Sequence, residues 1–130
     1  MNRKLEKQPV HLGLGACSVP LDDFDGSPDW YGRYMERFAG DGNEARLVSM
    51  YTFEEPWDVW EMHPAGSELI VVTAGELTLV QEIDGEPVET ALAAGEYAIN
   101  PAGVWHTADV SEPTTAIFIT AGVGTEHRQR

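Results

Sequence analysis

The chain has 130 residues, and its 22 acidic side chains outnumber 8 lysines and arginines to give a formal net charge of −14. Residues 47–127 hold 14 of the acidic residues and no lysine or arginine. This distribution argues against nucleic-acid binding, which requires basic residues to displace phosphate counterions. It also argues against an anionic membrane surface as a partner. If residues 47–127 bind an anionic substrate, the positive charge that meets it must come from a bound cation or from lysines or arginines outside this stretch.

The size and the apolar content indicate one domain with one core. Hydrophobic residues make up 42% of the chain, which is enough for a folded interior. Cys17 is the single cysteine, so an intramolecular disulfide framework is excluded and a reducing compartment is favoured. The first ten residues are charged and contain no apolar segment of a secretory signal. We therefore expect a soluble cytoplasmic protein.

Residues 1–45 are expected to form an N-terminal arm that packs on the main fold. A short strand is predicted at 11–19 and an acidic, turn-rich loop at 21–28. The aromatic-rich segment 30–38 fits either a short helix or a strand, and 39–43 is predicted to be a turn.

From Arg46 onward, short β-branched and aromatic runs recur, and each is closed by Gly, Pro or Asp. Asp84 and Gly85 form a dipeptide that is typical of a tight hairpin turn. A spacing of about ten residues per strand predicts an antiparallel sandwich or barrel over residues 46–122, followed by a C-terminal tail at 123–130. The predicted strands are 46–53, 57–63, 68–74, 76–83, 87–92, 96–100, 104–110 and 114–120.

Four side chains in this region are candidate metal ligands. Glu61 and His63 are two residues apart on one predicted strand, so they point to the same face. Glu68 opens the next strand, and His106 lies far along the chain. Two imidazoles and two carboxylates suit a divalent ion such as Zn²⁺, Mn²⁺, Fe²⁺ or Ni²⁺. On spacing alone, solvated glutamates and hydrogen-bonded core histidines are an equally good interpretation.

Two segments resemble the two sequence motifs of the cupin superfamily. Residues 61–75, EMHPAGSELIVVTAG, resemble the first motif, G-x5-H-x-H-x3,4-E-x6-G, and residues 95–110, GEYAINPAGVWHTADV, resemble the second, G-x5-P-x-G-x2-H-x3-N. The positions that match are His63, Glu68, Gly75, Gly95, Pro101, Gly103 and His106. This resemblance implies a cupin-type jelly-roll β-barrel with a metal near its mouth, and homodimers are common in that family.

The chain departs from these motifs at three positions. Glu61 stands where the first motif has its first histidine, Glu55 stands at the opening glycine, and Val110 stands at the final asparagine. A carboxylate still binds metal, so the resemblance implies Glu61, His63, Glu68 and His106 as the ligands. Glu61 is the substituted one.

Strand alternation predicts which neighbours share the interior with these ligands. If Glu61 points inward, Trp57 does too, whereas Trp60, Met62 and Trp105 point outward. Three large apolar side chains on an outer face require a cover. The N-terminal arm, a second subunit or another part of the same chain would each supply it.

The function predicted from these features is that of a metal-dependent enzyme acting on a small organic substrate, carboxylate-like or sugar-like. The family includes dioxygenases, isomerases and lyases, and the fold does not choose among them. Tyr97 and Tyr51 are the candidate acid–base residues. Arg33, Arg37 and Arg46 either pair with the acidic surface or bind a substrate carboxylate. The alternatives are a non-catalytic module that binds or senses a small ligand, and a metal-free structural barrel.

Overall fold

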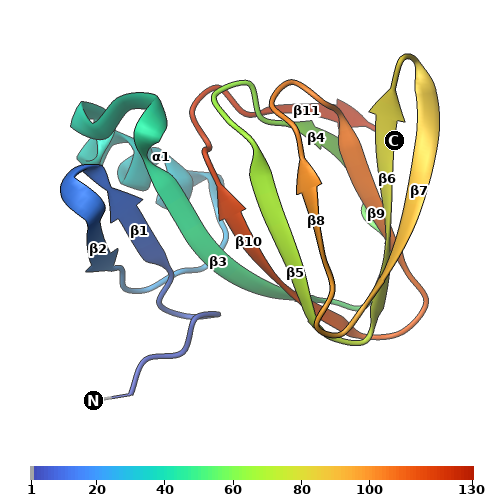
Figure 1. Ribbon diagram of the computed structural model, residues 1–130. Helices are drawn as coiled ribbons and strands as arrows, with labels where there is room; N and C mark the ends of the chain where they lie inside the picture. The colour runs from blue at the N-terminus through green and yellow to red at the C-terminus, as the bar shows by residue number, and fades with distance from the viewer. Residues whose placement is uncertain (1) are drawn as a thin grey trace.

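The structure is a computed structural model that describes residues 2–130, and it is built mainly of β-strands (Figure 1). The strands are β1 (Val10–Gly13), β2 (Cys17–Pro20), β3 (Arg46–Phe53), β4 (Val59–Met62), β5 (Glu68–Ala74), β6 (Glu76–Ile83), β7 (Glu86–Ala93), β8 (Tyr97–Asn100), β9 (His106–Val110), β10 (Thr114–Thr120) and β11 (Glu126–Gln129). One α-helix, α1 (Pro28–Arg37), and two 3₁₀ segments, η1 (Leu14–Ala16) and η2 (Ala39–Glu44), complete the elements of the described residues.

The strands form two antiparallel sheets that face each other. One sheet has the order β2-β1-β3-β10-β5-β8, and the other has the order β11-β4-β9-β6-β7. Figure 1 shows the two layers side by side, with β1, β2 and α1 gathered at one end. The prediction of an all-β antiparallel architecture is confirmed. Within residues 2–130 the hydrogen-bonded ladders remain two sheets rather than one closed barrel.

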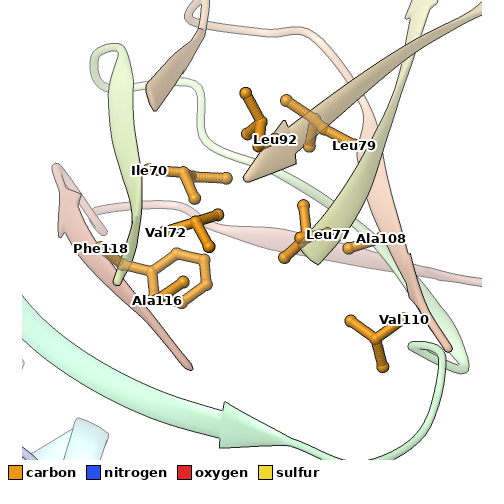
Figure 2. Packing of buried hydrophobic residues seen from close by; sticks show 9 residues of the cluster. All are labelled: Ile70, Val72, Leu77, Leu79, Leu92, Ala108, Val110, Ala116 and Phe118. Atoms are coloured by element: carbon orange, nitrogen blue, oxygen red, sulfur yellow. The ribbon is translucent and has the colours of Figure 1, made fainter. Parts of the chain in front are cut away.

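The main core fills the space between the sheets. Ile70 and Val72 of β5 face Leu77 and Leu79 of β6, and all four are fully buried (Figure 2). Their spacing of two residues reflects strand alternation, which sends every second side chain inward. Trp57 packs against this cluster, as the alternation from Glu61 predicts.

Two tight connections depend on backbone that favours glycine. Asp84 and Gly85 both have positive φ values, of 52° and 79°, so the predicted hairpin between β6 and β7 is confirmed. Gly75, the closing glycine of the first motif, has φ of 81°, and a Cβ there would lie 2.6 Å from the carbonyl oxygen of Pro113. Any side chain at Gly75 would therefore strain the turn between β5 and β6.

The N-terminal region extends the six-stranded sheet. The single strand predicted at 11–19 is wrong, because η1 divides it into the hairpin of β1 and β2, and Gly15 adopts a φ of 72° in between. The open choice at 30–38 resolves to helix α1, which Ser27 caps by accepting a hydrogen bond from the backbone of Trp30. No helix among the described residues is long and apolar enough to span a bilayer.

The predicted C-terminal tail contains strand β11, which pairs with β4. Its Arg128 guanidinium lies 5.1 Å from the ring centre of Trp60 and 4.6 Å from that of Trp105. Stacking of this kind buries apolar ring surface under a cation. The cover predicted for these two outward tryptophans therefore comes, at least in part, from the same chain.

Candidate metal centre

Both sheets contribute to one cluster of imidazole and carboxylate groups. Glu61 lies on β4 directly across from His106, the first residue of β9. His63 follows β4, and Glu68 begins β5 in the opposite sheet. The fold thus brings together all four residues that the sequence analysis proposed as ligands.

The ligand atoms of this cluster converge. One atom each from Glu61, His63 and His106 lie within 4.8 Å of one another. The two carboxylate oxygens of Glu68 lie 3.2 Å from Nε2 of His63 and 3.2 Å from Nε2 of His106. Two donors bound to one Zn²⁺ at about 2.1 Å are roughly 3.0–3.4 Å apart. The contacts of Glu68 therefore match the spacing of ligands that share an ion.

Glu68 is an ionised group in the protein interior. Its side chain is only 3% exposed, and burial by itself would raise the pKa of its carboxyl. The imidazoles of His106 and His63, each 3.2 Å from a carboxylate oxygen, outweigh that effect, so the pKa of Glu68 lies well below its usual range. Burial also lowers the pKa of His63, but the Glu68 carboxylate raises it further, and the net direction is upward. In the absence of a metal, a proton on His63 is the natural counter-charge to Glu68.

Two side chains hold the Glu68 carboxylate in place. The Asn100 amide donates to Oε1 at 3.1 Å, and the Thr120 hydroxyl donates to Oε2 at 2.5 Å. Gln81 in turn donates to the Asn100 carbonyl oxygen at 2.8 Å. Such outer partners fix the orientation of a ligand. They were absent from the sequence analysis because each depends on pairing between distant strands.

A threonine fixes the tautomer of His63. Its Nδ1 lies 2.8 Å from Oγ1 of Thr125, and that hydroxyl donates its single proton to the carbonyl oxygen of Gly122 at 2.9 Å. Thr125 must therefore accept from His63, so Nδ1 carries the hydrogen. In neutral His63, the lone pair is then on Nε2, the atom that faces Glu68.

His127, which belongs to neither cupin motif, also contacts the site. It lies on β11 across from Glu61, and its Nε2 is 2.9 Å from Oε2 of that carboxylate. The other oxygen, Oε1, is 3.9 Å from Nε2 of His106. Glu61 thus lies between two histidines in adjacent strands. Strand alternation within 126–129 predicts which side chains share a face with His127. Only the pairing of β11 with β4 shows that this face meets Glu61.

Unsatisfied polar atoms gather at this site. Within residues 2–130, the buried side-chain nitrogens and oxygens without a hydrogen-bond partner are Trp57 Nε1, His63 Nε2, His106 Nδ1 and His106 Nε2. The ring centres of Trp57 and His106 are 6.0 Å apart, and those of His63 and His106 are 5.3 Å apart. Orphaned buried polar groups are costly and rare in native proteins. Lone pairs directed at carboxylates are the arrangement that a cation would satisfy.

The two tyrosines of the sequence analysis occupy different surroundings. Tyr51 points inward from β3, packs against the main core and forms a short hydroxyl–hydroxyl contact with Tyr31 of α1. Burial raises the pKa of both phenols, and the charges of Glu61 and Glu68 add to that rise. Tyr97 is 64% exposed on β8, on the face opposite to Asn100. Its position gives no support to a catalytic role.

Comparison with known proteins identifies the family of this chain. A family model of the cupin domain matches residues 52–122, which is more than half of the chain. Among curated protein sequences, none matches this chain significantly. The chain belongs to the cupin family, and the predicted cupin-type fold is confirmed.

Two solved structures with TM-scores of 0.50 or more have a similar fold, and one further structure is similar at a lower score. A hydroquinone 1,2-dioxygenase in complex with Cd²⁺ and 4-hydroxybenzonitrile has 19% identity and a TM-score of 0.52, over 58% of this chain and 56% of that chain. A cupin superfamily protein from Desulfitobacterium hafniense has 19% identity and a TM-score of 0.50, over 58% and 65%. Hydroxypropylphosphonic acid epoxidase from S. wedmorenis has 21% identity and a TM-score of 0.48, over 58% and 42%. Each match spans less than two thirds of the other chain, and the first two likenesses concern the fold alone.

Proposed function

We propose that this protein binds one divalent metal ion through His63, Glu68 and His106, with Glu61 as a fourth group, and that it is a metal-dependent enzyme acting on a small organic substrate. The observation that carries the proposal is the pair of Nε2 atoms of His63 and His106, which lack hydrogen-bond partners and face the buried Glu68 carboxylate. Two histidines and one carboxylate with open positions are typical of non-haem Fe²⁺ oxygenases, and Zn²⁺, Mn²⁺ and Ni²⁺ accept the same donor types.

A bound ion would act as a Lewis acid and leave an open position for an oxygen donor of the substrate. The chain supplies little other positive charge here. Arg33 pairs with Asp29 at 3.6 Å, and Arg37 lies over the ring of Phe38. Arg46 is exposed at the start of β3. These contacts support the interpretation that arginines of the N-terminal region serve the surface and the small N-terminal core of Leu21, Trp30, Tyr34 and Leu47, and that an anionic substrate group meets the metal.

The hydroxyl pair of Tyr31 and Tyr51 is the chemical group we assign to substrate binding. Only one of two paired hydroxyls donates within the pair, so the other hydroxyl keeps a proton for a third partner. Because burial raises the pKa of Tyr51, that phenol stays protonated at neutral pH. It is suited to donate a hydrogen bond or a proton to a substrate oxygen, and it is not suited to act as a base.

Aromatic side chains pack beside this pair. Tyr51 is stacked on Phe53 and meets Phe118 edge-on, and Phe53 in turn packs against Trp57. Aromatic surroundings of this kind favour a substrate with an apolar or aromatic body, since flat rings pack well on other rings. We therefore propose a small substrate with an apolar body and at least one oxygen donor, in place of a sugar.

The non-catalytic binding module is the alternative, and an inner wall without ionisable groups would favour it. The phenols of Tyr31 and Tyr51, which the charges of Glu61 and Glu68 influence, support an enzyme instead. Turnover of a bound substrate distinguishes an enzyme from a binding module.

The test uses full-length protein loaded with Fe²⁺ or Mn²⁺ and the probes catechol and salicylate, which carry oxygen donors on an aromatic ring. We expect metal-dependent binding by calorimetry and oxygen uptake or loss of the probe. Tyr51→Phe should weaken probe binding about 2- to 10-fold through the loss of one hydrogen bond, with unchanged metal content. Tyr97→Phe is the matched control and should bind like the wild type. Equal binding without metal would refute the proposal, and binding without turnover would favour the binding module.

A further inference from the structure

We propose that the C-terminal segment 122–129 positions two groups of the metal centre, His63 through Thr125 and Glu61 through His127. The segment begins where the match to the cupin family ends, at residue 122. Strand β11 pairs along the whole of β4, from Glu126 across from Met62 to Gln129 across from Val59. This pairing sets His127 beside Glu61. The inference rests on the proposed metal binding and adds residues that neither cupin motif contains.

His127 acts on Glu61 as a hydrogen-bond donor. A carboxylate only accepts hydrogen bonds, so Nε2 of His127, 2.9 Å from Oε2, carries the hydrogen. A protonated nitrogen has no lone pair for a metal, which makes His127 a positioning residue and not a ligand. With Oε2 held at β11, Oε1 is directed to the side of His106. The Glu61 carboxylate on β4 is thereby oriented between His127 on β11 and His106 on β9.

Glu61 needs such a partner more than Glu68 does. Asn100 and Thr120 hold both oxygens of the buried Glu68. Glu61 has a side chain that is 26% exposed, and its hydrogen-bond partner is His127. Because Glu61 replaces the motif's first histidine, whose ring would have fewer rotatable bonds, a second contact that fixes its rotamer compensates for the longer and more flexible side chain.

Thr125 performs the corresponding task for His63. It accepts the Nδ1 hydrogen while its own proton remains on the carbonyl oxygen of Gly122. A hydrogen bond to the outer nitrogen fixes the ring orientation and leaves Nε2 as the donor to the metal. Thr125 and His127 lie two residues apart, so one short segment orients two ligands at the C-terminal end of β4.

The experiment measures the affinity of the full chain for Co²⁺ by competition with a chromophoric chelator, together with the visible spectrum of the bound ion. His127→Ala and Thr125→Val are each expected to weaken binding about 10- to 100-fold and to alter the spectrum. His127→Gln and Thr125→Ser, which retain a side-chain donor and a hydroxyl respectively, should restore most of the affinity. Gln129→Ala, on the same strand and face as His127, is the control and should match the wild type.

The outcomes separate the inference from the function on which it rests. If wild-type protein binds Co²⁺ but the alanine and valine variants bind with unchanged affinity and spectrum, the positioning role is wrong. If Gln129→Ala weakens binding as much as His127→Ala, β11 acts only as a structural strand, and the inference also fails. If wild-type protein binds no Co²⁺, the proposed metal function itself is overturned.

Discussion

His106→Ala is expected to abolish stoichiometric binding of a divalent ion. The imidazole is fully buried, both of its nitrogens lack a hydrogen-bond partner, and Nε2 lies 3.2 Å from Glu68. Loss of an outer partner typically costs about 10- to 100-fold in metal affinity, so loss of a direct ligand should exceed about 100-fold. Equilibrium dialysis against Zn²⁺, followed by elemental analysis, gives the stoichiometry and the affinity.

Asp109→Asn is the matched control for this variant. Asp109 lies on the same strand but on the outer face, where it pairs with Arg130 at 2.7 Å. The Asp109→Asn protein should retain one ion per chain, and circular dichroism should show that both variants are folded. Retention of one tightly bound ion by a folded His106→Ala protein would mean that the ion binds elsewhere.

Glu68→Gln should remove both the metal site and the unusual titration of His63. In the wild type without metal, the pKa of His63 is raised above its ordinary value of 6.5. A raised folded-state pKa stabilises the fold fully below that ordinary value, and this stabilisation is lost as the pH rises through the folded-state pKa. Without the Glu68 charge, burial dominates and the pKa of His63 should fall below 6.5. The sign of the pH dependence should therefore reverse.

Two measurements on metal-free protein check this result between about pH 5 and 9. Proton NMR of the histidine rings follows the pKa of His63, and urea denaturation follows the free energy of unfolding. Glu89→Gln, at an exposed position of β7, is the control and should behave as the wild type does. An unchanged pKa of His63 in Glu68→Gln would show that Glu68 is not its counter-charge.

Both carboxylates of the site come from the stretch that gives the chain its negative charge. Glu68 faces the imidazoles of His63 and His106, and a bound metal or a proton on His63 would compensate its charge inside the fold. Metal binding and protonation of His63 are therefore in competition, and metal affinity should increase with pH. The absence of lysine and arginine between residues 47 and 127 makes an ion the natural positive charge of this interior.

The strands and the four candidate ligands were accessible from the sequence because both depend on short-range patterns. Alternation within one strand places Glu61 and His63 together, and turn residues such as Gly75 and Gly85 delimit the strands. His106 and Glu68 follow from the motif spacing. The strands at 46–53, 68–74, 76–83 and 114–120 have the bounds that the sequence predicted.

The groups around the ligands were not accessible, because each requires pairing between distant segments. His127 contacts Glu61 only because β11 returns to β4, and Tyr31 meets Tyr51 only because α1 packs against the sheet end. The hairpin of β1 and β2 was missed because Gly15, with a φ of 72°, turns the chain within a run that was predicted as one strand. Tyr97 was proposed for the site although it is exposed, because the composition of a strand does not reveal which face of β8 a residue occupies.

The most direct test of the central claim is diffraction at the absorption edge of the metal, from crystals of the protein grown with Zn²⁺ or Fe²⁺. We expect one anomalous peak per chain at about 2.0–2.3 Å from Nε2 of His63, Nε2 of His106 and an oxygen of Glu68. A peak at other residues, or none in crystals of protein supplied with excess metal, would contradict the account.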